Sequence, residues 1–183
     1  WLSRAPWPRT GREVLNTVIV GILLHGTYLT GVFVAIYNGV PAWVASLLTG
    51  LHPLLTALLA GSTLGEHIRV SQWLGFALGL LGISLVLWQG DTQTSLPMIG
   101  ILACAAGLLA LTGGSLFQKR FGTSTDLRTG QAIQQMAAFA LVLPCAFLFE
   151  SREVQWTGQF IFSLAWLTGV LSIGMFTLLY LLI

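Results

Sequence analysis

The sequence predicts an all-α protein, a polytopic transmembrane helix bundle with six spans. Only 8% of its 183 residues are charged, whereas about 25% are charged in an average soluble domain. Hydrophobic residues make up 55% of the chain, and the mean hydropathy is +0.84. The uncharged stretches are long enough for the roughly 20 apolar residues of a spanning helix, whereas a transmembrane barrel would show alternating segments of about ten residues. These observations exclude a soluble globular protein.

Turn residues divide the uncharged stretches into spans. The 52 residues between Glu13 and Glu66 would form a helix of roughly 78 Å, far longer than a hydrocarbon core of about 30 Å. A turn is predicted at residues 38–41, Asn-Gly-Val-Pro, because Asn and Gly tolerate left-handed backbone and proline suits a first helical turn. Ser71 and Thr129 are expected N-caps, and Pro97 is expected in a first turn. The predicted spans are residues 14–37, 41–64, 71–89, 97–118, 129–149 and 157–182.

The basic residues predict the orientation, because short loops rich in Lys and Arg stay in the cytoplasm. Seven of the eight lie before the first span or in the loops after the second and fourth spans: Arg4, Arg9, Arg12, Arg69, Lys119, Arg120 and Arg128. The loops on the opposite side hold only Arg152. We therefore expect a multi-pass protein of the cell membrane, plasma or bacterial inner, with the basic loops cytoplasmic.

A short pattern recurs in two spans of opposite orientation. Residues 21–28 and 169–176 share two glycines five residues apart, followed by an aromatic residue two positions later. Inverted repeats are typical of secondary transporters, which bind their substrate at the repeat interface near the bilayer midplane. A chance match between two glycine-rich helices is the alternative.

Residues 51–66, LHPLLTALLAGSTLGE, and residues 72–85, QWLGFALGLLGISL, carry a more specific pattern. It consists of a proline, a Gly-Glu pair at a helix end, and then Trp-x-Gly and Gly-x-x-Gly in the next span. This pattern resembles the EamA family of the drug/metabolite transporter superfamily. The residues that match it as structural motif positions are Pro53, Gly65, Glu66, Gly75, Gly79 and Gly82.

The resemblance implies a protein of ten spans in two inverted repeats of five, with both ends in the cytoplasm. Proteins of this family move amino acids and other small metabolites, usually outward. The six spans here would correspond to spans three to eight of such a protein. Residues 1–90 would then be the C-terminal part of the first repeat, and residues 91–183 the N-terminal part of the second.

Two histidines are predicted near the bilayer centre. His25 lies 12 residues beyond Glu13, about 18 Å along a helix, and His52 lies midway along the second span. Ionisable residues at this depth usually face a protein interior or a wet cavity, and histidine titrates near neutral pH. Both are candidates for substrate contact or proton coupling, although each could equally be a neutral ring hydrogen-bonded to a neighbouring helix. Two ligands without a nearby carboxylate or thiolate are too few for a metal, so we expect neither a metal nor a cofactor.

Other polar residues in the spans extend this set. Pro53 cannot donate a hydrogen bond to Thr49, which predicts a kink that either lines a binding site or serves packing alone. Gln131, Gln134 and Gln135 share one helix face, where they either join helices or line an inner vestibule. Hydroxyl groups come from Tyr28, Thr49, Thr56, Thr112, Ser115 and Ser172, each of which alone more often serves helix packing. The candidate substrate-binding or coupling residues are His25, Tyr28, Thr49, His52, Gln134, Gln135 and Ser172.

These features favour a secondary transporter that exports or exchanges a small metabolite, such as an amino acid, by alternating access. The alternative is a non-transporting membrane scaffold or assembly subunit. An enzyme is not expected, because no nucleophile and base are paired, and Cys104 and Cys145 fit as small apolar fillers. The expected partners are a small-molecule substrate, membrane lipid and a coupling ion such as a proton; a homodimer is compatible with the sequence, and nucleic acid is not expected.

Overall fold

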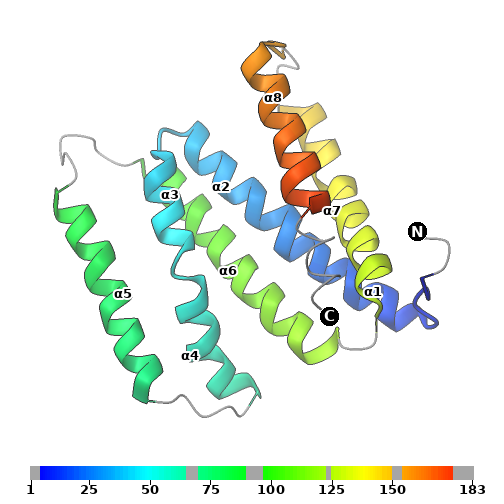
Figure 1. The fold of residues 1–183 in the computed structure, drawn as a ribbon, viewed down its shortest axis with the longest axis horizontal. Coiled ribbons are helices and arrows are strands. Elements are labelled where there is room, and N and C mark those ends of the chain that lie inside the picture. The colour runs from blue at the N-terminus through cyan, green and yellow to red at the C-terminus, as the bar shows by residue number, and fades with distance from the viewer. Residues whose placement is uncertain (1–4, 65–69, 90–96, 123–124, 150–153, 175–183) are drawn as a thin grey trace. The chain divides into compact units, whose positions relative to one another are not determined.

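In the computed structural model, residues 5–64, 70–89, 97–122, 125–149 and 154–174 are described (Figure 1). The regular structure within these ranges is helical, which confirms the predicted all-α class. The elements are α1 (Gly11–Gly21), the π-helix η2 (Ile22–Thr27), α2 (Tyr28–Tyr37), α3 (Ala42–Thr49), α4 (His52–Leu64), α5 (Val70–Gln89), α6 (Met98–Phe121), α7 (Leu127–Phe149), α8 (Gly158–Trp166) and the π-helix η3 (Leu167–Gly174). The chain forms two compact units, residues 1–145 and residues 146–183.

Among the described residues, four helical segments are long and apolar enough to cross a membrane. They are Gly11–Tyr37, Ala42–Gly61, Met98–Phe121 and Leu127–Leu148, and they coincide with the first, second, fourth and fifth predicted spans. The third predicted span coincides with helix α5. The sixth begins as α8 and η3, and its last residues, 175–182, lie outside the described ranges.

The predicted turn between the first two spans is confirmed. Helix α2 ends at Tyr37, and Gly39 adopts a φ of +92°, a conformation that costs glycine little. Pro41 then caps α3, and its carbonyl oxygen accepts hydrogen bonds from the backbone of Val44 and Ala45. The missing N–H of proline costs nothing here, because the first N–H groups of a helix have no partner within it.

The two expected N-caps are wrong, although Pro97 does cap α6. Helix α5 begins at Val70, so Ser71 lies inside it. Helix α7 begins at Leu127, because the Asp126 carboxylate already accepts a hydrogen bond from the Arg128 backbone N–H. The hydroxyl of Thr129 is fully buried and donates instead to the carbonyl oxygen of Pro6, 2.9 Å away.

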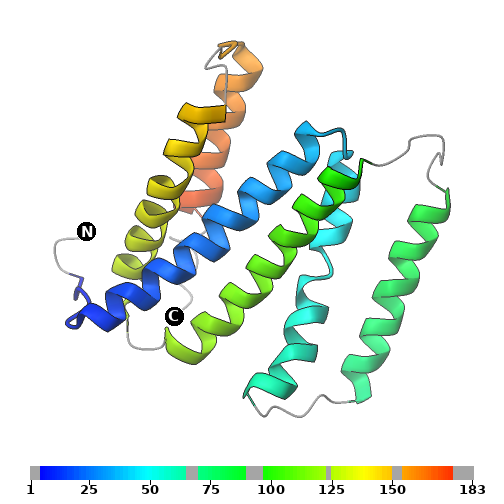
Figure 2. The same cartoon turned by 180° about the vertical axis from the view of Figure 1, so that it is seen from behind.

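Helix α6 is the central helix of the first unit. It contacts α1, η2 and α2 along the first span, and α3 and α4 along the second (Figures 1 and 2). Three glycines, spaced every seven residues along α6, face the first span. Gly100 lies against Val40 and Ala35, Gly107 against Tyr28 and Gly31, and Gly114 against Leu23 and Leu24. Small residues of this kind let two helix backbones approach closely, and the order of the contacts shows that α6 runs antiparallel to the first span.

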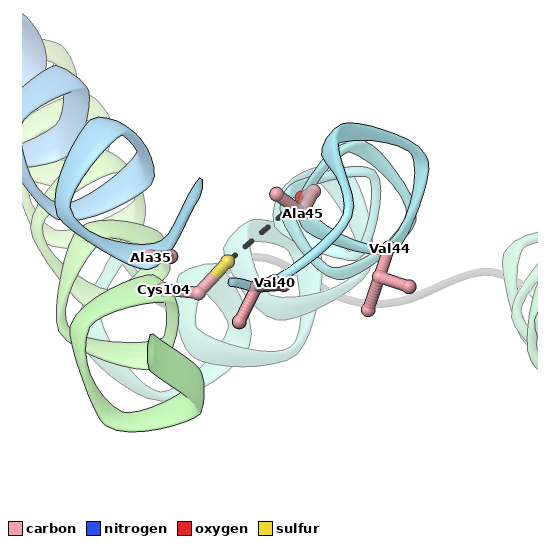
Figure 3. Close-up of a cluster of buried hydrophobic side chains, with 5 residues drawn as sticks. All are labelled: Ala35, Val40, Val44, Ala45 and Cys104. Atoms are coloured by element: carbon pink, nitrogen blue, oxygen red, sulfur yellow. Dashed lines mark hydrogen bonds between the residues drawn. The ribbon is translucent and has the colours of Figure 1, made fainter. Parts of the chain in front are cut away.

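Cys104 of α6 lies at the centre of a small apolar cluster with Ala35, Val40, Val44 and Ala45 (Figure 3). Its side chain is fully buried, and its thiol lies 3.9 Å from the carbonyl oxygen of Ala45. Cys104 and the half-buried Cys145 are both free thiols. Cys104 therefore acts as the small apolar filler that the sequence predicts, and it joins α6 to both ends of the turn at Gly39.

The residues of the EamA-like motif fall on α4, on α5 and in the segment between them. Gly79 of α5 contacts the Leu54 side chain of α4, whereas a Cβ on Gly75 or Gly82 would meet no described atom within 4 Å. Gly65 and Glu66 lie outside the described residues. Among the described glycines, the tightest contacts are thus made by the first, fourth and fifth spans rather than by this motif.

The second unit contains α8 and η3. The Thr157 hydroxyl caps α8 by accepting a hydrogen bond from the Phe160 backbone N–H. The aromatic rings of Trp156 and Phe160 meet edge to face, with centroids 5.7 Å apart. The large apolar side chains of α8 are exposed, which suits a helix in contact with lipid.

We expect Gly31→Ala to weaken the contact between α2 and α6. A Cβ on Gly31 would lie 2.6 Å from the Ala103 carbonyl oxygen, so one backbone must shift, at a cost of about 1–3 kcal/mol. Thermal unfolding in detergent measures the effect. Gly113→Ala is the control, because a Cβ there meets nothing within 4 Å; equal melting of the two variants would contradict the close contact.

Candidate functional site

The first span contains a π-helical segment, η2, which the sequence pattern did not predict. It follows α1 directly and carries His25. Segments of this kind are rare and are frequently found at functional sites. Its flanking glycine Gly21 lies against the backbone of Gln134 in α7, and Gly26 lies against Ala138 and Leu141 of the same helix. The π-helical segment is therefore held between α6 and α7.

His25 forms a polar cluster between η2 and α7. Its Nε2 lies 3.4 Å from the Nε2 of Gln131, and the side chain of Gln134 also hydrogen-bonds the ring. An amide nitrogen can only donate, so the facing imidazole nitrogen accepts. The side chain of Gln134 is 7% exposed, while His25 is half-buried. The imidazole of His25 thus hydrogen-bonds the side-chain amides of both glutamines in an otherwise apolar interface.

His52 forms a second polar cluster, between α4 and α6. Its Nδ1 lies 3.2 Å from the Thr56 hydroxyl on the next turn of α4 and 3.4 Å from the Thr112 hydroxyl of α6. Its Nε2 lies 3.5 Å from the Ser115 hydroxyl, also of α6. Thr112 is 1% exposed, so the cluster reaches the buried face of the central helix.

The predicted interruption of the second span is present immediately before His52. Helix α3 ends at Thr49 and α4 begins at His52, with Gly50 and Leu51 between them. The Thr49 hydroxyl bonds to carbonyl oxygens of its own helix, at Ala45 (3.0 Å) and Ser46 (3.1 Å). The helix breaks here because Pro53 has no backbone N–H to donate to the carbonyl oxygen of Thr49.

The six candidate residues of the first unit do not gather at one place. His25 and Gln134 lie in one cluster, and His52 lies in the other. Tyr28 is half-buried at the start of α2, and Gln135 is exposed on α7. Ser172 lies in η3 of the second unit, where its side chain is outside the described part of the structure.

Sequence reasoning named the hydroxyls of Thr56, Thr112 and Ser115 but did not connect them to His52. The spacing of Thr56, four residues after His52, was a usable signal, because such residues share a helix face. The spacing of Thr112 and Ser115, three residues apart, was a second one. Neither signal shows which two helices pack together, so the pairing of α4 with α6 needed the structure.

Metal ligands are also scarce near these clusters. Within the described ranges, no group of three or more His, Cys, Asp or Glu side chains is placed to hold a metal ion. The side chains of the two clusters carry imidazole, amide and hydroxyl groups, which can donate and accept hydrogen bonds with small polar molecules.

Comparison with known proteins finds a family match in the first half of the chain. Residues 1–88 match the EamA-like transporter family, which confirms the resemblance seen in the motif. The chain is 26% identical over 165 residues to the uncharacterized transporter YvbV of Bacillus subtilis (strain 168), covering 89% of this chain and 54% of that protein. It is 27% identical over 163 residues to the uncharacterized inner membrane transporter YedA of Escherichia coli (strain K12), covering 89% and 49%.

A third relative has a more specific name. The "probable amino-acid metabolite efflux pump" of Escherichia coli (strain K12) is 24% identical over 124 residues, which is 68% of this chain and 40% of that protein. The chain spans about half the length of the first two curated relatives. No solved structure matches the chain.

We expect Gln134→Leu to destabilise the protein and Gln135→Leu to leave its stability unchanged. The first change removes a buried amide that bonds to His25, at a cost of about 1 kcal/mol for a polar contact between membrane helices. The second alters an exposed position on the same helix. Thermal unfolding in detergent separates the two, and equal losses would argue against the cluster between η2 and α7.

Proposed function

We propose that the protein is a secondary transporter, on the premise that residues 1–88 match the EamA-like transporter family. It exports or exchanges a small polar metabolite, such as an amino acid, by alternating access. The family match is the single observation that carries the proposal. The named relatives are an uncharacterized transporter of Bacillus subtilis, an uncharacterized inner membrane transporter of Escherichia coli and a "probable amino-acid metabolite efflux pump" of Escherichia coli.

The polar clusters support transport over a purely structural role. Polar groups inside a membrane are costly and usually mark a substrate or ion pathway. This chain places histidine, glutamine and hydroxyl groups at two interfaces between apolar helices, beside a π-helical segment in one span and a break in the other. A scaffold needs neither interruption, and irregular backbone at this depth suits a cavity wall.

We assign substrate contact to the clusters of His25 and His52, with Gln134, Tyr28 and Thr49 contributing to the pathway wall. Residues 1–90 and 91–183 are proposed to come from the two inverted repeats of a ten-span protein. His25 and His52 lie in the first of these parts and their hydrogen-bond partners on α6 and α7 lie in the second. A substrate between the parts would therefore meet groups from both.

The direct test is uptake of labelled amino acids and small metabolites by proteoliposomes that hold the full-length protein. We expect at least one compound to enter faster than into empty vesicles. His25→Gln, which keeps an amide in place of the imidazole, should reduce that flux about tenfold, equivalent to about 1.4 kcal/mol, while melting at the temperature of the unchanged protein.

The control variant is Ser46→Ala, whose exposed hydroxyl bonds only to the Ala42 carbonyl oxygen of its own helix in the described structure. Its flux should equal that of the unchanged protein. If none of the compounds enters, or if every variant that loses flux has also unfolded, the scaffold interpretation gains over transport.

The proposed orientation places the loop at Lys119 and Arg120 in the cytoplasm and the loop before α8 outside. Single cysteines at Arg120 and Gln155 test this, in a background where Cys104 and Cys145 are alanine. Both positions are exposed. A membrane-impermeant maleimide added to intact cells should label position 155 alone, and both positions after permeabilisation. Labelling of position 120 alone in intact cells would show that the orientation is the opposite of the one proposed.

A further inference from the structure

The hydrogen bonds of the His52 cluster determine the tautomer of its ring. The Ser115 hydroxyl donates its one hydrogen to the Leu111 carbonyl oxygen, at 2.9 Å. Towards His52 it can therefore only accept, so Nε2 must carry the hydrogen. Nδ1 is then the acceptor, and the hydroxyls of Thr56 and Thr112 both lie within hydrogen-bond distance of it. The neutral ring is thus matched by donors on one nitrogen and an acceptor on the other.

The same cluster can accommodate a proton on Nδ1 with small movements. One proton from solution would add to the unprotonated Nδ1, which would give up the hydrogen bonds that it accepts, and the ring would gain one positive charge. The hydroxyls of Thr56 and Thr112 would rotate so that their oxygens accept from the new N–H. Their hydrogens could then go to the carbonyl oxygens four residues earlier, on His52 and Leu108, as threonine hydroxyls do in helices.

The charged groups around His52 are few and distant along the chain. Helices α3, α4 and α5 carry no Asp, Glu, Lys or Arg, and His52 is their only histidine. Helix α6 carries Cys104, which packs against Ala45, and Lys119 and Arg120, which are exposed at its C-terminal end. The other described histidine of the spans, His25, bonds to α7. Within the described residues, His52 is therefore the titratable group of the hydroxyl cluster, and Lys119 lies one helical turn beyond Ser115 on α6.

We propose that His52, held by Thr56, Thr112 and Ser115, binds the proton that drives transport. The inference rests on the proposed transport function and names its coupling ion. A charged ring in an apolar interface is costly, so the protonated protein favours the conformation in which this interface is hydrated. The neutral protein favours the closed contact between α4 and α6 seen here. Proton binding thereby shifts the population between two states.

The direct test is ¹⁵N NMR of the histidine side chains of the full-length protein in lipid nanodiscs. The sequence printed here has only three histidines, and the spectrum of His52→Gln identifies the signals of His52 by difference. We expect the Nε2–H tautomer at pH 8 and a ring protonated on both nitrogens at pH 5, across the range in which histidine titrates. A His52 ring that stays neutral at pH 5 overturns the proposal, whatever the flux experiments give.

Variants of the hydroxyl partners test the arrangement itself. Ser115→Ala removes the acceptor of the Nε2 hydrogen, so we expect a rise in the Nδ1–H tautomer at pH 8. Ser46→Ala is the matched control. It removes a serine hydroxyl from the second span, which also carries His52, but this hydroxyl bonds to the Ala42 carbonyl oxygen and not to the His52 ring. It should leave the His52 signals unchanged. Identical spectra for Ser115→Ala and the unchanged protein would overturn the role of Ser115.

Flux measurements connect proton binding to transport. An imposed pH gradient should accelerate uptake by the unchanged protein, whereas the uptake measured for His52→Gln, whatever its rate, should be the same with and without the gradient. Persisting acceleration in His52→Gln overturns the proposal and leaves the transporter intact. A protein whose His52 titrates but that moves no compound contradicts the transport function instead, so the two failures are distinguishable.

Discussion

The close contact between α6 and the first span organises the first unit. Lipid offers no hydrophobic drive for helices to associate, so membrane helices depend on packing and on interhelical hydrogen bonds. Glycines every seven residues on α6 supply that packing along most of its length. The second span packs against α6 around Cys104, and α7 packs against the first span at Gly21 and Gly26. These contacts therefore place the second span and α7 against the first span and α6.

The polar clusters lie at the edges of this packed centre. His52 reaches α6 through hydroxyls on its buried face, and His25 reaches α7 through two amides. Close glycine packing leaves no space for a polar molecule, whereas hydrogen bonds between side chains can be exchanged for bonds to water or substrate at little cost. At α7 the two kinds of contact occur together, because the His25 cluster lies between the close contacts of Gly21 and Gly26.

The sequence was sufficient for the fold class, the turn at Gly39 and the break before His52, because these follow from charge spacing and from the backbone chemistry of glycine and proline. It was also sufficient for the EamA-like motif. It misplaced the cap of α7, because Asp126 and Thr129 are both good capping residues and only tertiary contact with Pro6 decides between them. The His52 cluster could not be predicted, because its partners lie about 60 residues away and no local pattern shows which helices meet. The two π-helical segments have no local signal that we recognise.

The π-helical segment η2 changes the phase of the first span. A π-helix closes hydrogen bonds one residue further along the chain than an α-helix does, and one residue of an α-helix corresponds to about 100° of rotation. Side chains after Thr27 therefore point in different directions from those that a single α-helix from Gly11 would give. Gly21 and Gly26 can face α7 while Gly31 and Ala35 face α6 and the turn. One continuous span thereby serves two neighbours, and a helical wheel drawn over its whole length would assign its faces wrongly.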